Sequence, residues 1–109
     1  MDTQTKTQSR FNDMINDSTP LLVDFFATWC GPCKMMAPVL NDIKGSFGDR
    51  LRIIKIDIDN PANAGIVSHY GIRSVPTLML FRNGELLWRE SGARSATELG
   101  EIIRTHATL

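Results

Sequence analysis

Two apolar runs of strand length, separated by a stretch with helical spacing, restrict the fold of this chain more than any other feature. The runs are Leu21–Ala27 (LLVDFFA) and Leu51–Ile58 (LRIIKIDI), and such runs are typical of strands buried on both faces. Between them, apolar residues recur three and four positions apart, as on one face of a helix. These are Met36, Val39, Leu40, Ile43 and Phe47. Since a crossover of this kind is right-handed, we predict two parallel strands joined by a helix.

A hairpin and a final helix are predicted after this unit. Asn83-Gly84 separates two strand-like segments, Thr77–Arg82 and Glu85–Ser91, and this dipeptide is the strongest short hairpin signal. The sequence from Ser95 to Glu98 matches a capping box, which marks the start of a helix. We therefore predict an α/β fold with a mixed sheet and helices on both faces.

Three weaker signals complete the pattern. Asn60-Pro61 predicts a capped short helix that ends at Gly71, and Pro38 predicts a kink in the long helix. Residues Thr3–Thr7 are polar, so a strand there is expected to be short, frayed or absent. A short first helix is predicted from apolar residues at helical spacing, which are Phe11, Met14 and Ile15.

Length and charge restrict the organisation and the partners. The 109 residues fit a single domain over 1–109, with a polar N-terminal segment, 1–8, that can fray. The 12 Lys and Arg residues balance the 12 Asp and Glu residues, so nucleic acid and anionic membranes are not expected as partners. The polar start has no apolar core of the kind a secretion signal contains. We expect a cytoplasmic monomer with no membrane-spanning segment.

The only two cysteines, Cys30 and Cys33, have two residues between them. A bridge between them closes almost no loop and adds little stability, so their purpose is interpreted as chemical. Cys30 lies where a buried strand ends and a helix begins, and the positive end of a helix dipole stabilises a thiolate. Cys30 is therefore expected to attack a substrate disulfide, and Cys33 to resolve the mixed disulfide. The same spacing also occurs in half of a zinc site.

Five segments of the chain resemble the thioredoxin family. The active-site signature of the family is similar to Val23–Lys34 (VDFFATWCGPCK). Later matches are Ile56–Pro61 (IDIDNP), Tyr70–Leu80 (YGIRSVPTLML), Phe81–Leu86 (FRNGEL) and the pair Gly92-Ala93. The order and spacing of these segments also match the family from Phe11 onward. The resemblance implies a five-stranded mixed sheet flanked by four helices, with the N-terminal strand in doubt.

The resemblance also implies an activity and its partners. Members of the family reduce disulfides in protein substrates by dithiol–disulfide exchange. A flavoprotein reductase that draws on NADPH supplies their electrons, and they carry no bound cofactor or metal. The Gly31-Pro32 dipeptide between the cysteines resembles that of the reducing members.

Two charged residues are expected to support the cysteines. Asp24 lies within an apolar strand, where a carboxylate is costly to bury. The resemblance implies a buried acid with a raised pKa that relays a proton to or from Cys33, and Lys55 is implied as its neighbour. Each has a simpler alternative: Asp24 reaches water or a partner, and Lys55 buries its stem while its charge reaches solvent. Asp59 is interpreted as an ordinary polar residue at a strand end.

A substrate surface is expected around the cysteines. The resemblance implies a cis Val75–Pro76 bond that faces them, with the Val75 backbone pairing to an extended substrate. The alternative is a proline that only begins a strand. An exposed Trp29 would serve docking, whereas a buried one would serve packing. The residues expected to line this surface are Trp29, Gly31, Pro32, Val75, Pro76, Gly92 and Ala93.

The sequence departs from the family pattern at three positions, and three other functions are possible interpretations. Phe26 stands where many members have tryptophan, and Ser74 and Ser91 replace a glycine and an apolar residue on the substrate rim. These changes leave substrate preference undetermined. The alternative functions are a disulfide oxidase or isomerase, a metal-delivery module, and a binding module that does not use its cysteines.

Overall fold

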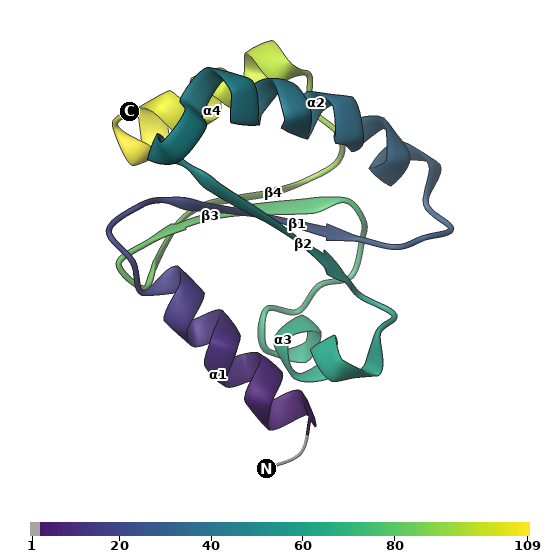
Figure 1. Cartoon of the computed structure of the whole chain (residues 1–109). Coiled ribbons are helices and arrows are strands. Elements are labelled where there is room, and N and C mark those ends of the chain that lie inside the picture. Colours follow the sequence, from purple (N-terminus) through teal and green to yellow (C-terminus); the bar gives the residue numbers. More distant parts are fainter. Residues whose placement is uncertain (1–2) are drawn as a thin grey trace.

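A four-stranded mixed sheet lies at the centre of the molecule (Figure 1). The structure, a computed structural model, describes residues 3–109. The strands are β1 (Leu21–Phe26), β2 (Arg52–Asp57), β3 (Thr77–Arg82) and β4 (Glu85–Ser91), in the order β2-β1-β3-β4. The helices are α1 (Thr3–Ile15), α2 (Gly31–Phe47), α3 (Ala64–His69) and α4 (Ala96–Ala107). Two 3-10 turns, Gly48–Arg50 and Pro61–Asn63, precede β2 and α3. The predicted α/β thioredoxin fold is confirmed.

Strand β1 occupies the middle of the sheet and has partners on both sides. It pairs in parallel with β2 and antiparallel with β3, and β3 pairs antiparallel with β4. The predicted parallel crossover and hairpin are therefore confirmed. Because both edges of β1 are paired and both faces are covered, its first five residues are buried. Such a strand can place a side chain deep in the molecule at a fixed position.

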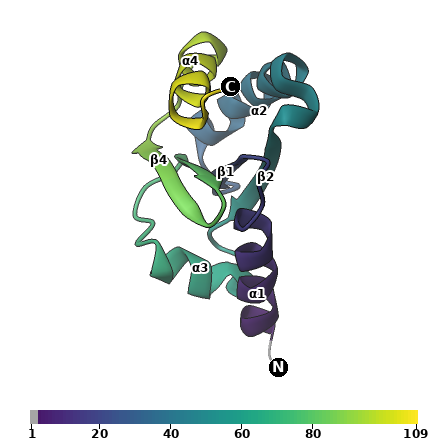
Figure 2. The same ribbon diagram turned by 90° about the vertical axis from the view of Figure 1, so that its left-hand side faces the viewer.

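Helices cover both faces of the sheet. Helices α2 and α4 lie on one face, and α1 and α3 lie on the other (Figures 1 and 2). Side chains alternate between these faces along β1. Leu22 belongs to the cluster under α2 and α4, whereas Leu21 and Val23 belong to the cluster over α1 and α3. The alternation therefore directs Asp24 toward α2.

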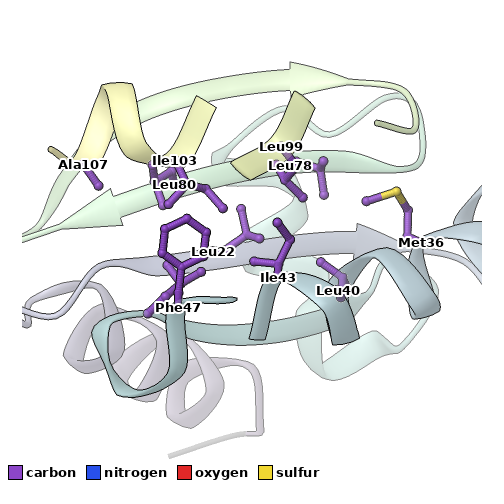
Figure 3. Close-up of a cluster of buried hydrophobic side chains, with 11 residues drawn as sticks. Leu22, Met36, Leu40, Ile43, Phe47, Leu78, Leu80, Leu99, Ile103 and Ala107 are labelled. Carbon is purple, nitrogen blue, oxygen red and sulfur yellow. The ribbon is translucent and has the colours of Figure 1, made fainter. Parts of the chain in front are cut away.

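The core under α2 and α4 is made of aliphatic side chains and one phenylalanine, Phe47 (Figure 3). Helix α2 contributes positions at helical spacing, as predicted. The buried members are Leu22, Met36, Leu40, Ile43, Phe47, Leu51, Leu78, Leu80, Leu99, Ile103 and Ala107. The opposite core is centred on Phe11, whose ring meets those of Tyr70 and Phe81 edge to face. Each face of the sheet is therefore packed against helices.

Capping and turn residues behave as the sequence predicts. Ser95 Oγ accepts a hydrogen bond from the Glu98 N–H at 3.1 Å, and Glu98 Oε1 accepts one from the Ser95 N–H at 3.3 Å. This capping box begins α4. In the β3–β4 hairpin, Asn83 and Gly84 both have positive φ, at 51° and 80°. Positive φ at both central residues is the geometry of a type I′ turn.

The N-terminal expectations need correction. Residues Thr3–Thr7 form no strand, and instead they begin α1, which extends over 13 residues rather than a short stretch near Phe11. In the described residues the sheet therefore has four strands instead of five. Of the outcomes expected for the N-terminal strand (short, frayed or absent), the structure shows the last. The Thr7 hydroxyl donates to the Thr3 carbonyl at 2.8 Å, and the first turns contact the Pro61–Asn63 turn. Tertiary contact thus supports a helix that its polar sequence does not predict. Residues 1 and 2 of the expected polar segment lie outside the described residues.

The two remaining helix predictions have different outcomes. Asn60 Oδ1 accepts the Ala62 N–H at 3.0 Å, as a cap should, but the turn that follows is 3-10 before α3 begins at Ala64. Gly71, with φ of 59°, follows the end of this helix. Helix α2 continues through Pro38, and the kink there stays a prediction. No helix in residues 3–109 has the length and apolarity to cross a membrane.

Candidate active site

The cysteine pair lies at the junction between β1 and α2. Cys30 is the N-cap of α2, and its Sγ accepts a hydrogen bond from the Cys33 N–H at 3.1 Å. The two cysteines form a disulfide with a Cα–Cα distance of 5.3 Å. Only 4% of each residue is exposed. Because a helix N-terminus leaves N–H groups unpaired, this position stabilises negative charge on the Cys30 sulfur when the disulfide is reduced.

The loop that precedes β3 approaches Cys30 Sγ. Cys30 Sγ lies 3.7 Å from the Val75 carbonyl oxygen. The Val75–Pro76 peptide bond is cis, as the resemblance implies. The Pro76 carbonyl accepts a hydrogen bond from the Gly92 N–H at 2.8 Å. The structure thus brings together the cysteine, the proline loop and the Gly92–Ala93 loop.

Asp24 is fully buried within β1, with 0% exposure. Within the described part of the chain, neither carboxylate oxygen has a hydrogen-bond partner. Loss of hydration raises the pKa of Asp24 from 3.8 to about 6, against the opposing effect of the Lys55 charge. Lys55 is the register partner of Asp24 on β2, and its exposed ammonium lies 5.4 Å from the centre of the Phe26 ring. Asp24 therefore has a raised pKa, whereas Lys55 reaches solvent along the surface.

An open hollow of about 400 Å³ lies beside the second cysteine. Cys33, Phe26 and Lys55 line it together with residues at the start of α2. Its walls are mainly carbon atoms. Cys33 therefore borders an open hollow although only 4% of the residue is exposed.

Trp29 is exposed and is held by a partner that the sequence did not indicate. The residue is 69% exposed, and its Nε1 donates to Asp59 Oδ2 at 2.8 Å. The interpretation of Asp59 as an ordinary polar residue is incomplete, because it orients this indole. The ends of parallel β1 and β2 meet at one edge of the sheet, and this rule could have placed Asp59 near Trp29. Gly31 and Pro32 are also exposed, and no atom lies within 4 Å of a Cβ built at Gly31.

Arg94 is a second residue that sequence reasoning missed. Its Nη1 lies 3.3 Å from the Gly92 carbonyl oxygen and 3.2 Å from the Ala93 carbonyl oxygen. Its Nη2 forms an ion pair with Glu90 Oε1 at 3.3 Å. Gly92 has φ of 101°, a conformation that favours glycine. Arg94 therefore folds over the carbonyl groups of a loop that the resemblance places on the substrate rim.

The two unusual serines lie near one buried threonine. The Thr77 hydroxyl is 2.7 Å from the Ser74 carbonyl oxygen, to which it donates, and 2.9 Å from Ser91 Oγ. Ser91 thus joins β4 to the first residue of β3. In residues 3–109, no group of three or more His, Cys, Asp or Glu side chains is arranged to hold a metal ion.

Comparison with known proteins agrees with this geometry. The thioredoxin family model matches residues 2–105. The thioredoxin of Acidithiobacillus ferridurans is 47% identical over 91 residues, which cover 84% of this chain and 82% of that protein. The thioredoxin of Haemophilus influenzae is 40% identical over 85% of each chain. The solved structure of the Malassezia sympodialis thioredoxin superimposes with a TM-score of 0.79 at 34% identity, and covers 91% of this chain and 84% of its own.

The class of protein follows from the site and these relatives together. A cysteine pair in a disulfide at a helix start, facing a cis-proline loop, is the site of a thiol–disulfide oxidoreductase. Its fold and its signature from Trp29 to Cys33 are those of one family in particular. The chain belongs to the thioredoxin family.

Proposed function

We propose that this protein reduces disulfides in other proteins, with Cys30 as the attacking thiol and Cys33 as the resolving thiol. The position of Cys30 carries the proposal, because its sulfur caps α2 and accepts the Cys33 N–H at 3.1 Å. Cys33 lies within the first turn of the helix and is not the N-cap. Stabilisation of a thiolate by the helix start therefore favours attack by Cys30.

The exchange transfers two electrons in two steps. In the reduced protein, the Cys30 thiolate attacks one sulfur of a substrate disulfide, a mixed disulfide forms, and the other substrate sulfur leaves as a thiolate and takes up a proton. Cys33 then loses its proton and attacks Cys30, which forms the Cys30–Cys33 disulfide and releases the second substrate thiol. The pair is oxidised and the substrate disulfide is reduced.

Asp24 is proposed to accept the Cys33 proton during the second step. Its pKa of about 6 means that an ionised carboxylate is available near neutral pH and can be protonated at little cost. Its direction toward α2 supports this role. Lys55, its register partner, is proposed to tune the pKa of the carboxyl through its charge.

The substrate is proposed to bind as an extended segment across the exposed side of the disulfide. Val75 would pair with its backbone, because the Val75 carbonyl already lies 3.7 Å from Cys30 Sγ. Trp29, at 69% exposure, offers an apolar surface beside it. The other contributors are Gly31, Pro32, Pro76, Gly92 and Ala93. A flavoprotein reductase drawing on NADPH is proposed to return the protein to its dithiol form.

Trapping with Cys33→Ser tests the order of attack. This variant lacks the resolving thiol, so it should accumulate mixed disulfides through Cys30 when mixed with an oxidised protein such as insulin, measured by mass spectrometry. The matched control, Cys30→Ser, should trap far less. Equal trapping by both variants would contradict the assigned roles.

A redox titration tests the direction of the reaction. The Cys30–Cys33 pair is equilibrated with mixtures of reduced and oxidised glutathione, and the disulfide fraction is measured by alkylation. A reductant should remain in its disulfide form except under strongly reducing mixtures. A potential well above that of the cytosolic glutathione pool would instead identify an oxidase or isomerase.

A further inference from the structure

A groove with cationic side chains and no carboxylates runs between α2 and β2, away from the exposed side of the disulfide. Two adjoining hollows, of about 400 and about 500 Å³, share Ala37 and Lys55 as lining residues. Together they extend from Cys33 to Lys44, about three turns further along α2. We call this surface the α2–β2 groove. Strand β2 passes beneath α2 at this place (Figure 1).

The charge of the groove is one-sided although the chain is neutral. Four cations and no Asp or Glu are among its lining residues, which include Lys34, Lys44, Arg52 and Lys55. Lys44 Nζ already donates to the Gly48 and Leu51 carbonyls, and Arg52 Nη2 donates to the Met14 and Thr19 carbonyls on the α1 side. The charges available to an occupant are therefore mainly those of Lys34 and Lys55. The single ion pair within residues 3–109 joins Arg94 to Glu90, so a carboxylate neutralises none of these four cations at contact distance. Between the cations, the walls are mainly apolar. An occupant should therefore combine negative charge with apolar side chains.

Strand β2 offers the groove an unpaired backbone edge. It is the outermost strand on its side of the sheet. The Arg52 N–H donates to Pro20 and the Ile58 N–H donates to Phe26, each at 2.9 Å, so even-numbered residues direct their backbone groups toward β1. Because these groups alternate along a strand, those of Ile53 and Lys55 face the free edge. Such an edge accepts an extended segment as an additional strand.

We propose that the α2–β2 groove docks an extended acidic segment of a partner protein, which adds to the β2 edge and places alternate side chains among the cations. One end of this edge is already occupied, since Asn63 Nδ2 donates to the Asp57 carbonyl at 2.9 Å. The segment therefore pairs with the Ile53 and Lys55 backbone. This surface is separate from the rim around Trp29 and Gly92, and the inference does not depend on the proposed reductase function.

Two other occupants fit the groove less well. A second copy of the chain, paired edge to edge through β2, would bring the exposed Lys55 side chains of both copies together, and like charges oppose this arrangement. The chain's own segment from Thr3 to Arg10 carries two cations and no acid, and it is part of α1 on the other face of the sheet. Charge complementarity thus favours an acidic partner.

Peptide binding tests the proposal with the oxidised protein. The probe is a fluorescent hexapeptide of alternating glutamate and valine, and the comparison is the same peptide with lysine in place of glutamate. We expect the acidic peptide to bind about tenfold more tightly by fluorescence anisotropy, and to weaken as salt rises. Equal affinity of the two peptides would overturn the proposal.

Two further measurements locate the binding. Asn41→Glu places a carboxylate in the groove, outside the cysteine site, and should weaken acidic-peptide binding about tenfold. The matched control, Thr105→Glu on exposed α4, should bind normally. Amide NMR signals of Ile53 and Lys55 should move on titration. Movement confined to Trp29 and Gly92 would place the peptide on the disulfide rim, and peptide-induced dimers would indicate a second copy; either result contradicts the proposal.

Discussion

The two ends of the layer between α2 and the sheet are built on different principles. At the end away from the disulfide, Phe47, Leu80, Ile103 and Ala107 pack with no polar side chain among them (Figure 3). Toward the disulfide end, the same layer holds a buried carboxylate without a hydrogen-bond partner in the described chain, Asp24. Along the chain it lies three residues before Ala27, which clusters with Cys30 and Cys33.

The difference shows which end of the layer stabilises the fold and which end carries a reactive group that costs stability. The end away from the disulfide raises the free energy of unfolding, because its aliphatic side chains are buried and need no polar partner. An ionised carboxyl in the same layer is destabilising, because it has lost its water. Substitutions at the two ends should therefore change different properties.

Leu99→Ala should have the largest effect on stability. Leu99 has 0% exposure in the core under α2 and α4, and such truncations cost about 2–5 kcal/mol. Urea unfolding should show this loss, while disulfide reduction at a temperature where the variant is folded should be unchanged. The control is Leu86→Ala, at an exposed leucine on β4, with little expected loss. A similar loss in both variants would remove the distinction between core and surface.

Asp24→Asn should stabilise the protein above pH 6 and slow its chemistry. The pKa of Asp24 is raised from 3.8 to about 6, so its contribution to stability is complete below pH 3.8 and is lost as pH rises through 6. Two pKa units correspond to about 3 kcal/mol, an upper limit for the gain at pH 8. Urea unfolding across this pH range measures it, with no gain expected near pH 3.8.

The same variant tests the proton-transfer role. Reduction of a small disulfide should be slower in Asp24→Asn, and the change in rate near pH 6 should disappear. Asp42→Asn, at an exposed position on α2, is the control for loss of a carboxylate. A pH–rate profile equal to that of the unaltered protein would rule out proton transfer by Asp24 while leaving the stability prediction intact.

Arg94→Ala should have the smallest effect, and only on protein substrates. Without the guanidinium over the Gly92 and Ala93 carbonyls, the rim loop is less constrained. KM for a protein disulfide should rise about threefold with kcat unchanged, which indicates weaker uniform binding. Glu90→Gln removes only the ion pair and should change KM less, because exposed ion pairs contribute little. A fall in kcat for small disulfides would place Arg94 in the chemistry instead.

The central part of the fold was predictable from sequence because local patterns and tertiary structure agree there. The runs at β1 and β2, the apolar stripe of α2, the Asn83-Gly84 turn and the capping box each satisfy a rule that needs only neighbouring residues. The position of Cys30 at the helix start follows from the same patterns.

Features that depend on contacts distant in sequence were not predictable. The first turns of α1 are polar and have no local signal for a helix, and they contact residues near Pro61. Asp59 reaches Trp29 across 30 positions of sequence. Arg94 acts on carbonyl groups next to it in sequence, but arginine has no fixed local preference that would predict this fold-back.

The position of Asp24 in β1 also matters before the chain folds. LLVDFF is an apolar strand whose two partners, β2 and β3, come later in the chain, so it stays unpaired until they are available. Exposed segments of this type tend to associate with one another, and a charge within them opposes that association. In the unfolded chain Asp24 has its ordinary pKa and is ionised. The charge of this carboxylate thus opposes self-association of unpaired β1, and folding then makes the same group a weaker acid.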